Sequence, residues 1–232
     1  MDKQFSFTNS TSKEEFLRYA KFLVQRGYVH NTLGNIAVRG SFGSKPVILT
    51  KRRGCSLEEM DEDDIVATSL DGKQLIHGSV YPSIGHRMAV EVMRNRQDVN
   101  AIIHIHVNDI IAFFLSYPCQ RMPYISIDTP LITGADILVL DKGINVEVQA
   151  ELISEFIGGT NAFIMNNHGL TTLGRTLSEA FHRANSVVAE VQRLAQYLLF
   201  CSTKGISPQF LSDEEVENLY SSADEVIYGA NE

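Results

Sequence analysis

The sequence predicts an α/β protein in which helices flank a mixed or antiparallel sheet. Strand-like segments interleave with helical ones along the chain. Several of the strands follow each other closely early in the chain, which favours antiparallel pairing over parallel crossovers. Neither of the glycine-rich phosphate-binding patterns, GxGxxG and GxxxxGKS/T, occurs. A doubly wound nucleotide-binding fold is therefore not predicted.

The first predicted helix begins at a capping box formed by Ser12 and Glu15. In such a box, the two side chains satisfy backbone N–H groups that the first turn leaves free. The run EFLRYAKFLVQR follows, and Gly27 ends the helix. Three strand-like segments, separated by glycine-containing or charged turns, come next: Asn35–Arg39, Val47–Thr50 and Ile65–Thr68.

The middle of the chain continues this alternation. A second helix is expected to start after Ser83 and to include HRMAVEVMRNR. Five further elements are predicted, in the order buried strand, short helix, strand, helix and strand: Ala101–His106, Asn108–Leu115, Ile137–Leu140, Val146–Ile157 and Ala162–Met165.

The strongest helical signal runs from Leu177 to about Cys201. Thr176 and Glu179 form a second capping box ahead of it. Apolar residues then recur every three to four positions, as on the buried face of an amphipathic helix. A last helix is expected to begin at Ser212.

The composition is that of an ordinary globular protein, with 44% hydrophobic and 21% charged residues. A formal net charge of −8 disfavours nucleic-acid binding, because phosphates are bound by basic surfaces. No apolar run approaches the ~20 residues of a membrane span. No secretory signal is recognised, and the scattered cysteines Cys55, Cys119 and Cys201 indicate reduced thiols in a cytoplasmic protein. Without a linker or repeat, residues 1–232 are expected to form one domain.

Two histidines carry most of the chemical information. His104 and His106 lie two positions apart in a predicted strand, so their side chains are expected on the same face. His168 follows an apolar strand and precedes Gly169, where the backbone is expected to turn sharply and present the ring. Three neutral imidazoles suit Zn²⁺ with a position left open for water or substrate.

A plainer interpretation of these histidines is also open. A histidine on an apolar strand is commonly a hydrogen-bonded core residue, and that could apply to each of them. The histidines that lie outside the HxH and NHG patterns are expected to be surface or packing residues, apart from His86: His30, His77 and His182.

An ordered set of motifs resembles the class II aldolase/adducin family. The segments are GNIAVR (34–39), ILT…G (48–54), DIV (64–66), YPS (81–83), AIIHIH (101–106) and NNHGL (166–170). That family includes fuculose-phosphate aldolase and ribulose-phosphate 4-epimerase. The resemblance covers about residues 14–200 and leaves the tail, residues 207–232, unassigned. It implies a three-layer α/β/α fold with a central, mainly antiparallel sheet, and a cyclic homotetramer with active sites between adjacent subunits.

The resemblance also implies a divalent metal, usually zinc, held by His104, His106 and His168. Imidazoles suit manganese and iron as well, so the metal's identity stays open. The family's phosphate-binding positions correspond here to Gly34, Asn35, Thr50, Gly54 and Ser83. Ser83 is explained equally well as a plain helix N-cap.

The chain departs from the family at a chemically important position. The family usually reads P-S-S-E before the second helix, and its acid moves the substrate proton and can bind the metal. This chain reads Pro82-Ser83-Ile84-Gly85, so glycine stands in the acid's place. Loss of a general base typically costs about 10²–10⁴ in rate. His86 is a candidate for a substitute base or fourth ligand, and the alternative is an exposed first-turn histidine.

A second departure lies in the loop before Gly54, which is one residue longer and carries three basic residues, Lys51, Arg52 and Arg53. These could bind a carboxylate or phosphate, and the alternative is a solvated turn. Tyr124 lies near the family's usual proton donor, but the matching position falls on Ile127, so no donor is assigned.

The sequence thus predicts a metal-dependent lyase, of aldolase or decarboxylase type, that works next to a carbonyl. Its substrate is expected to be a small sugar-like or keto-acid molecule, with or without a phosphate. Decarboxylation of a β-keto acid needs an electron sink but no hydroxyl deprotonation, so it tolerates the missing acid better. Two alternatives remain open: an inactive adducin-like scaffold, and an iron oxygenase that uses the same three histidines.

Overall fold

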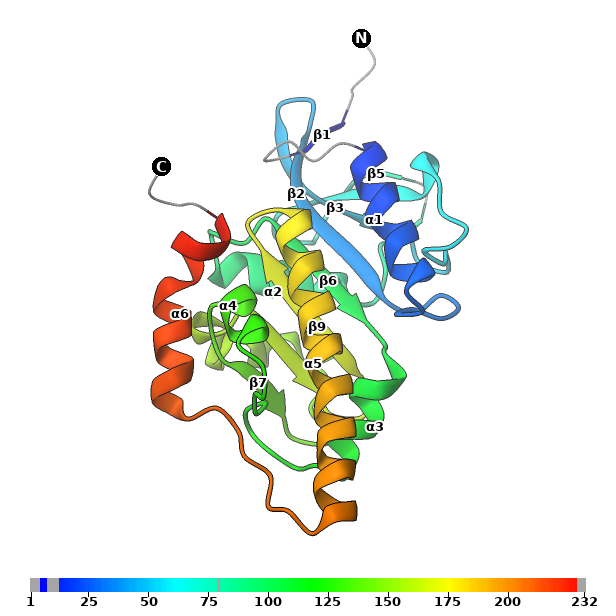
Figure 1. Ribbon diagram of the computed structural model, residues 1–232. Helices are drawn as coiled ribbons and strands as arrows, with labels where there is room; N and C mark the ends of the chain where they lie inside the picture. Colours follow the sequence, from blue (N-terminus) through cyan, green and yellow to red (C-terminus); the bar gives the residue numbers. More distant parts are fainter. Residues whose placement is uncertain (1–4, 8–12, 79, 229–232) are drawn as a thin grey trace.

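A sheet of nine strands runs through the molecule, with helices packed against both of its faces (Figure 1). The computed structural model describes residues 5–7, 13–78 and 80–228. The strands occur in the spatial order β5-β4-β3-β2-β6-β9-β8-β7, and β1 pairs with β2. Their bounds are β1 Phe5–Phe7, β2 Asn35–Phe42, β3 Lys45–Lys51, β4 Ile65–Ser69, β5 Leu75–His77, β6 Ala101–Ile105, β7 Ile137–Leu140, β8 Ala162–Met165 and β9 Gly169–Gly174.

The mainly antiparallel character of the sheet is confirmed. Among the described strands, every paired neighbour is antiparallel except β7 and β8, which run parallel. Strands β2 to β4 pair in chain order, as their close spacing in the sequence predicts. The strands β6 and β9 lie at the centre of the sheet, where β6 contacts β2 on one side and β9 on the other.

The helices form the outer layers. Their bounds are α1 Lys13–Gln25, α2 His86–Asn95, α3 Asn108–Ser116, α4 Asp128–Thr133, α5 Leu177–Lys204 and α6 Asp213–Tyr228, with short 3₁₀ helices η1 Glu62–Asp64, η2 Ala150–Glu155 and η3 Ile157–Gly159. The Thr176 hydroxyl accepts the Glu179 N–H at 3.1 Å, which confirms Thr176 as the N-cap. The Glu179 carboxylate accepts the Arg175 N–H, so the predicted box is confirmed only in this first half. Ser12, the other predicted cap, lies outside the described residues.

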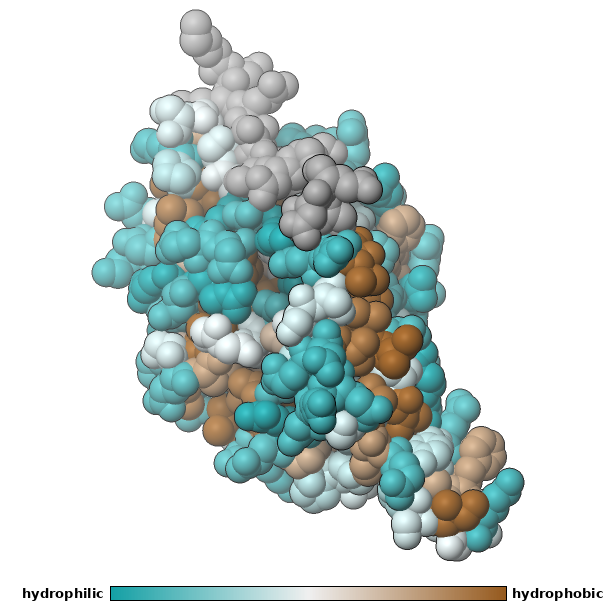
Figure 2. Space-filling view, turned by 60° about the vertical axis from the view of Figure 1, so that its left-hand side comes forward, coloured by the Kyte–Doolittle hydropathy of each residue, from teal (hydrophilic) through white to brown (hydrophobic). Residues whose placement is uncertain are grey.

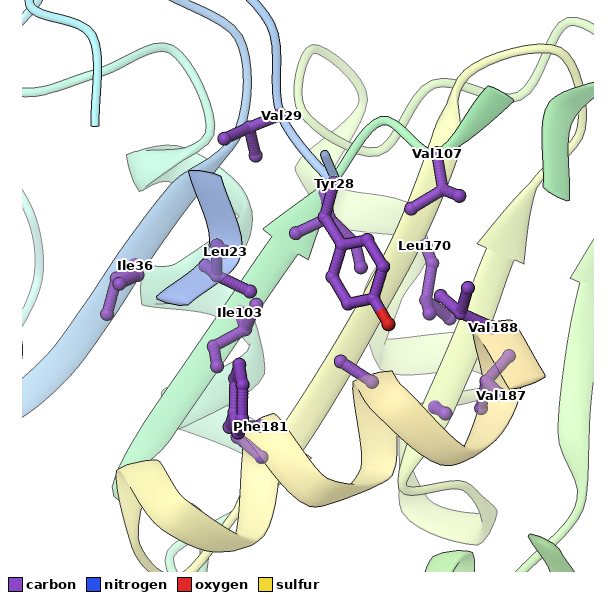
Figure 3. Packing of buried hydrophobic residues seen from close by; sticks show 14 of the residues in the cluster. Leu23, Tyr28, Val29, Ile36, Ile103, Val107, Leu170, Phe181, Val187 and Val188 are labelled. Atoms are coloured by element: carbon purple, nitrogen blue, oxygen red, sulfur yellow. The ribbon is translucent and has the colours of Figure 1, made fainter. Parts of the chain in front are cut away.

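Side-chain alternation along the strands divides the core into two parts. On β2, Ile36 and Val38 join the cluster that α1, α3 and α5 cover, whereas Ala37 joins the cluster beneath α2 and η2. Figure 3 shows Phe181 and Val188 of α5 packed against the strands that carry Ile103 and Leu170. The sheet is therefore buried on both faces, as in a three-layer α/β/α arrangement.

The C-terminal tail, which no sequence motif assigned, is part of this packing. Helix α6 lies beside α4 at the edge of the molecule (Figure 1). Val216 and Ala223 of α6 are buried. The Tyr220 hydroxyl lies 3.1 Å from the Tyr124 hydroxyl and donates to Asp136 Oδ1 at 3.2 Å.

The helix predicted over Val146–Ile157 is confirmed only in part, as short 3₁₀ helices from Ala150 onward. After β7 the chain forms a loop and then the short helices η2 and η3. The Asn145 side chain accepts the N–H of Glu147 at 3.0 Å. Such a side-chain bond competes with helical hydrogen bonding, which explains why no regular helix starts here.

The surface on the side of α6 is largely hydrophilic, with hydrophobic residues scattered over it (Figure 2). Several exposed hydrophobic residues lie at or just after the end of α5: Leu199, Phe200 and Ile206. Among the described helices, none combines the length and the apolar character that a bilayer crossing requires.

Candidate metal centre

Four side chains converge beside the central strands. One ligand atom from each of His104, His106, Glu147 and His168 lies within 4.8 Å of those of the others. The ring centroids of His104 and His106 are 4.7 Å apart, and the His168 ring lies 5.3 Å from the first and 4.8 Å from the second. The structure thus brings together the three histidines that the sequence singled out, and it adds a carboxylate.

Strand β6 places His104 by alternation. Ile103 and Ile105 pack in the core under α5, so His104 between them faces the opposite side of the sheet. Its partner on the neighbouring strand β9 is Thr171, whose hydroxyl lies 2.9 Å from His104 Nδ1. This contact fixes the ring and points Nε2 into the cluster, 3.0 Å from Nε2 of His106.

His168 lies in the tight connection between β8 and β9. The left-handed turn residue there is Asn167, with φ 61°, rather than the predicted Gly169. Gly169 is required for another reason: a Cβ atom at this position would lie 2.3 Å from the Ile105 carbonyl oxygen. The glycine therefore allows β9 to approach β6 closely, which brings His168 next to His104.

Glu147 is the site residue that the sequence analysis missed. It lies in the loop after β7, with its side chain 12% exposed. Its Oε2 is 3.0 Å from His168 Nε2, and its Oε1 is 4.0 Å from His104 Nε2. The topology explains why Glu147 lies near His168. Because β7 and β8 are parallel, the loops that follow the two strands emerge at the same edge of the sheet.

The electrostatic state of the cluster suits a cation. Burial is the main cause that lowers the pKa of His104 to about 3 and that of His106 to about 4. Both rings are therefore neutral at pH 7, the form that binds metals. Burial raises the pKa of Glu147, but the hydrogen bond from His168 and the neighbouring imidazoles outweigh it, and the pKa falls to about 2. Glu147 is thus a carboxylate.

A cavity of about 240 Å³ opens beside the cluster, with His106 and Glu147 in its wall. Most of the predicted anion-binding residues line it: Gly34, Asn35, Gly54 and Ser83. Thr50 does not belong to this group. Its side chain is fully buried, and its hydroxyl donates to the Ile36 carbonyl at 2.7 Å within the sheet. The prediction for Thr50 is therefore corrected.

The three basic residues of the loop before Gly54, Lys51, Arg52 and Arg53, have different environments. Lys51 lines the cavity, and its ammonium donates to the carbonyls of Thr32 and Cys55 at 2.6 and 2.9 Å. Burial lowers the pKa of Lys51 to about 8, which leaves it mostly protonated at pH 7. Arg53 also lines the cavity, whereas Arg52 pairs with Asp64.

Two residues of the cavity wall carry a buried polar atom without a hydrogen-bond partner within the described part of the chain. These atoms are Asn35 Oδ1 and Ser83 Oγ. Leaving such an atom unsatisfied costs about 1–3 kcal/mol. A polar ligand in the cavity would satisfy them. The three imidazoles and the carboxylate fit a divalent metal such as zinc, because nitrogen and oxygen donors of these kinds form tetrahedral sites.

The structure does not bring His86 to the cluster. The residue is 4% exposed, and its Nε2 lies 2.9 Å from the Thr68 hydroxyl. It belongs neither to the group of potential ligands nor to the cavity wall. The prediction of a substitute base or fourth ligand is therefore corrected, and so is its alternative of an exposed histidine. Tyr124 is also buried, and Ile127 is exposed.

Comparison with known proteins gives a consistent result. Residues 14–196 match the family described as "Class II Aldolase and Adducin N-terminal domain". The chain is 27% identical over 187 residues to an L-fuculose phosphate aldolase from Methanococcus maripaludis strain S2, covering 78% of this chain and 93% of that protein. It is 24% identical over 231 residues to a 3-oxo-tetronate 4-phosphate decarboxylase from Escherichia coli O6:H1, covering 94% of this chain and 99% of that protein. A solved structure of an L-fuculose 1-phosphate aldolase superposes with a TM-score of 0.73 at 24% identity, covering 93% of this chain and 97% of that one.

Proposed function

Because this chain belongs to the class II aldolase and adducin family, we propose that it is a metal-dependent lyase. It makes or breaks a carbon–carbon bond next to a carbonyl in a small sugar-like or keto-acid substrate that carries a phosphate. One observation carries this proposal: three imidazoles and a carboxylate converge, and two of these groups, His106 and Glu147, line a cavity that the buried Lys51 also lines. Relatives that act as an aldolase and as a phosphorylated keto-acid decarboxylase support the same class of reaction.

His104, His106 and His168 hold the divalent metal in this proposal, with zinc preferred to manganese or iron. When bound, such an ion polarises a carbonyl and stabilises the enolate that forms beside it. Thr171 orients His104, and Asn145 lies 3.4 Å from Nδ1 of His168. These contacts keep the rings in place before a substrate arrives.

In this proposal the anionic end of the substrate binds to other residues of the same cavity wall. Gly34, Gly54 and Asn35 line the cavity there, and the unpartnered Ser83 hydroxyl can donate to an anion. Lys51 adds a positive charge that is already desolvated, so little further desolvation is needed when an anion enters. This arrangement favours a phosphorylated substrate over a neutral sugar.

The assembly and location are proposed on the same basis. We expect a cyclic homotetramer with centres between adjacent subunits, in a cytoplasmic protein that binds no nucleic acid or membrane. The free thiols of Cys55, Cys119 and Cys201 are consistent with a reducing compartment. Light scattering during size-exclusion chromatography measures the proposed assembly directly.

Elemental analysis of the purified protein tests the proposal first. Stoichiometric zinc is expected, and it should disappear in His104→Ala and in His106→Ala. Screening against phosphorylated ketoses and 3-keto acids then identifies the substrate. Stoichiometric iron would instead favour the oxygenase, and absence of any metal from the wild-type protein would favour the scaffold.

A further inference from the structure

The space beside Gly85 is already filled by side chains from two other elements. A Cβ atom added at Gly85 would lie 2.2 Å from Asn35 Nδ2 and 2.3 Å from Glu147 Oε1, well inside any non-bonded contact. The backbone itself does not require glycine here, because φ is −64°. Gly85 is therefore explained by what occupies the neighbouring space, namely the amide of Asn35 and the carboxylate of Glu147.

The carboxylate in that space is held on several sides. Asn35 donates to Glu147 Oε1 at 3.4 Å, and His168 Nε2 lies 3.0 Å from Oε2. The Glu147 backbone N–H is fixed by Asn145 at 3.0 Å. A buried carboxylate is costly unless it is paired, so these contacts define one position for it among the imidazoles.

We propose that Glu147 supplies the carboxylate of this centre from the loop after β7, in place of a residue at position 85. This inference rests on the proposed metal-dependent function. Glu147 completes the ligand set with His104, His106 and His168, and positions 85 and 147 compete for one space. The carboxylate lies in the cavity wall, where a substrate would meet it.

The charge of the centre supports a ligand role. Three neutral imidazoles leave both positive charges of a divalent ion uncompensated in a partly buried site, and one carboxylate offsets half of that charge. Glu147 could instead act only as a hydrogen-bond partner that orients His168. The two roles differ in their response to Glu147→Gln, which keeps a hydrogen-bond acceptor of similar shape but removes the charge.

Zinc affinity, measured by competition with a chelator, tests the ligand role without an activity assay. The compared proteins are wild type, Glu147→Gln, Glu147→Ala and the matched control Glu151→Gln, which removes an exposed carboxylate four residues further along. Both Glu147 variants are expected to bind zinc more than about 100-fold more weakly, beyond the roughly 10–100-fold loss typical when only a hydrogen-bond partner of a ligand is removed, and the control to match wild type. A cobalt-substituted sample should also change its visible absorption in Glu147→Gln.

The outcomes separate this inference from the proposed function. If Glu147→Gln binds zinc as tightly as wild type while His106→Ala does not, the ligand role of Glu147 is overturned and the proposed function stands. If His106→Ala also leaves zinc binding unchanged, the proposed function itself fails.

A double-mutant cycle tests the competition for space. Gly85→Ala is expected to displace the Glu147 carboxylate and to weaken zinc binding, with little further effect when Glu147→Ala is already present. The exchange variant Gly85→Glu with Glu147→Ala is expected to regain affinity that Glu147→Ala alone has lost. Additive losses for Gly85→Ala and Glu147→Ala would overturn the competition. Should the exchange variant not fold, by circular dichroism, the alanine cycle decides.

Discussion

Lys51 is a cation that is almost completely buried, 1% exposed, at the end of β3. Two carbonyl oxygens accept from its ammonium, which leaves one N–H to face the cavity. A charge prepared in this way binds an anion more strongly than an exposed lysine does, because its own hydration has already been lost.

Lys51→Met is therefore expected to weaken binding of inorganic phosphate by about tenfold or more, the loss of one charge-assisted hydrogen bond. Isothermal titration calorimetry at pH 7 measures this. The matched control is Lys45→Met, which removes an exposed lysine from the same strand. Equal phosphate affinity in Lys51→Met and wild type would remove Lys51 from the anion-binding residues.

His86 makes a different contribution, to stability. Burial lowers its pKa to about 4, below the ordinary value of 6.5. Between these values the unfolded chain binds a proton that the folded protein does not, so His86 destabilises the fold as the pH drops from 6.5 toward 4. At higher pH the ring is neutral in both states and this effect vanishes.

His86→Gln, which can keep a bond to Thr68, is expected to reduce the loss of unfolding free energy between pH 7.5 and pH 5 by about 2 kcal/mol. Urea denaturation at the two pH values measures the difference. The other titrating groups are common to both proteins and cancel in the comparison. A pH dependence identical to that of wild type would show that His86 is not buried as a neutral ring.

At the scale of elements, the closeness of β6 and β9 positions the histidines. His104 is on β6, and His168 immediately precedes β9. Gly169, the first residue of β9, packs so closely against β6 that it has no room for a side chain. The contact is with backbone of Ile105, which cannot move aside as a side chain could.

Gly169→Ala is expected to lower the unfolding free energy by about 1–3 kcal/mol, the usual cost of overpacking. The matched control is Gly158→Ala, because a Cβ at Gly158 meets nothing within 4 Å and its φ is not in the left-handed region. Thermal or urea denaturation of both variants provides the measurement. Equal stability of the two would mean that β9 can shift away from β6.

The sequence predicted those parts of the centre that depend on local geometry. Strand alternation predicted that His104 and His106 would meet, and they do, although β6 ends at Ile105, one residue before His106. His168 is fixed by a short connection after an apolar strand. Glu147 could not be found in this way, since its contact with His168 depends on the parallel pairing of β7 and β8. The sequence also predicts a helix over Val146–Ile157, whereas the Asn145 side chain accepts the Glu147 N–H and the chain forms a loop there. Glu147 lies in this loop, which the prediction lacks. Thr50 and His86 are predicted as site residues from their positions in or beside the family motifs, but both side chains are buried in the fold.

At the scale of the whole molecule, α6 extends the fold beyond the family match, which ends at residue 196. The chain returns from the end of α5 and packs α6 against α4 (Figure 1). Tyr220 links α6 to two segments far from it in the sequence, because its hydroxyl meets both Tyr124 and Asp136. Its pKa is raised, mainly by burial, so the hydroxyl stays protonated and able to donate.

Tyr220→Phe is expected to cost about 1 kcal/mol of stability and to lower the melting temperature by about 2–4 °C for a chain of this size. Scanning calorimetry measures the change against Tyr81→Phe, a control in which the tyrosine is 73% exposed. A melting temperature as high as that of the control would indicate that α6 adds nothing through this hydroxyl.

The parallel pair β7–β8 has a consequence for judging distant homologues. Loops that leave neighbouring strands at one rim can be altered in length and composition while the scaffold underneath stays the same. An acidic group can thus be delivered to the same spot by unrelated stretches of polypeptide. A homologue should therefore not be judged inactive because its sequence lacks an acid at one aligned position. Its structure should first be checked for another carboxylate that occupies the same space.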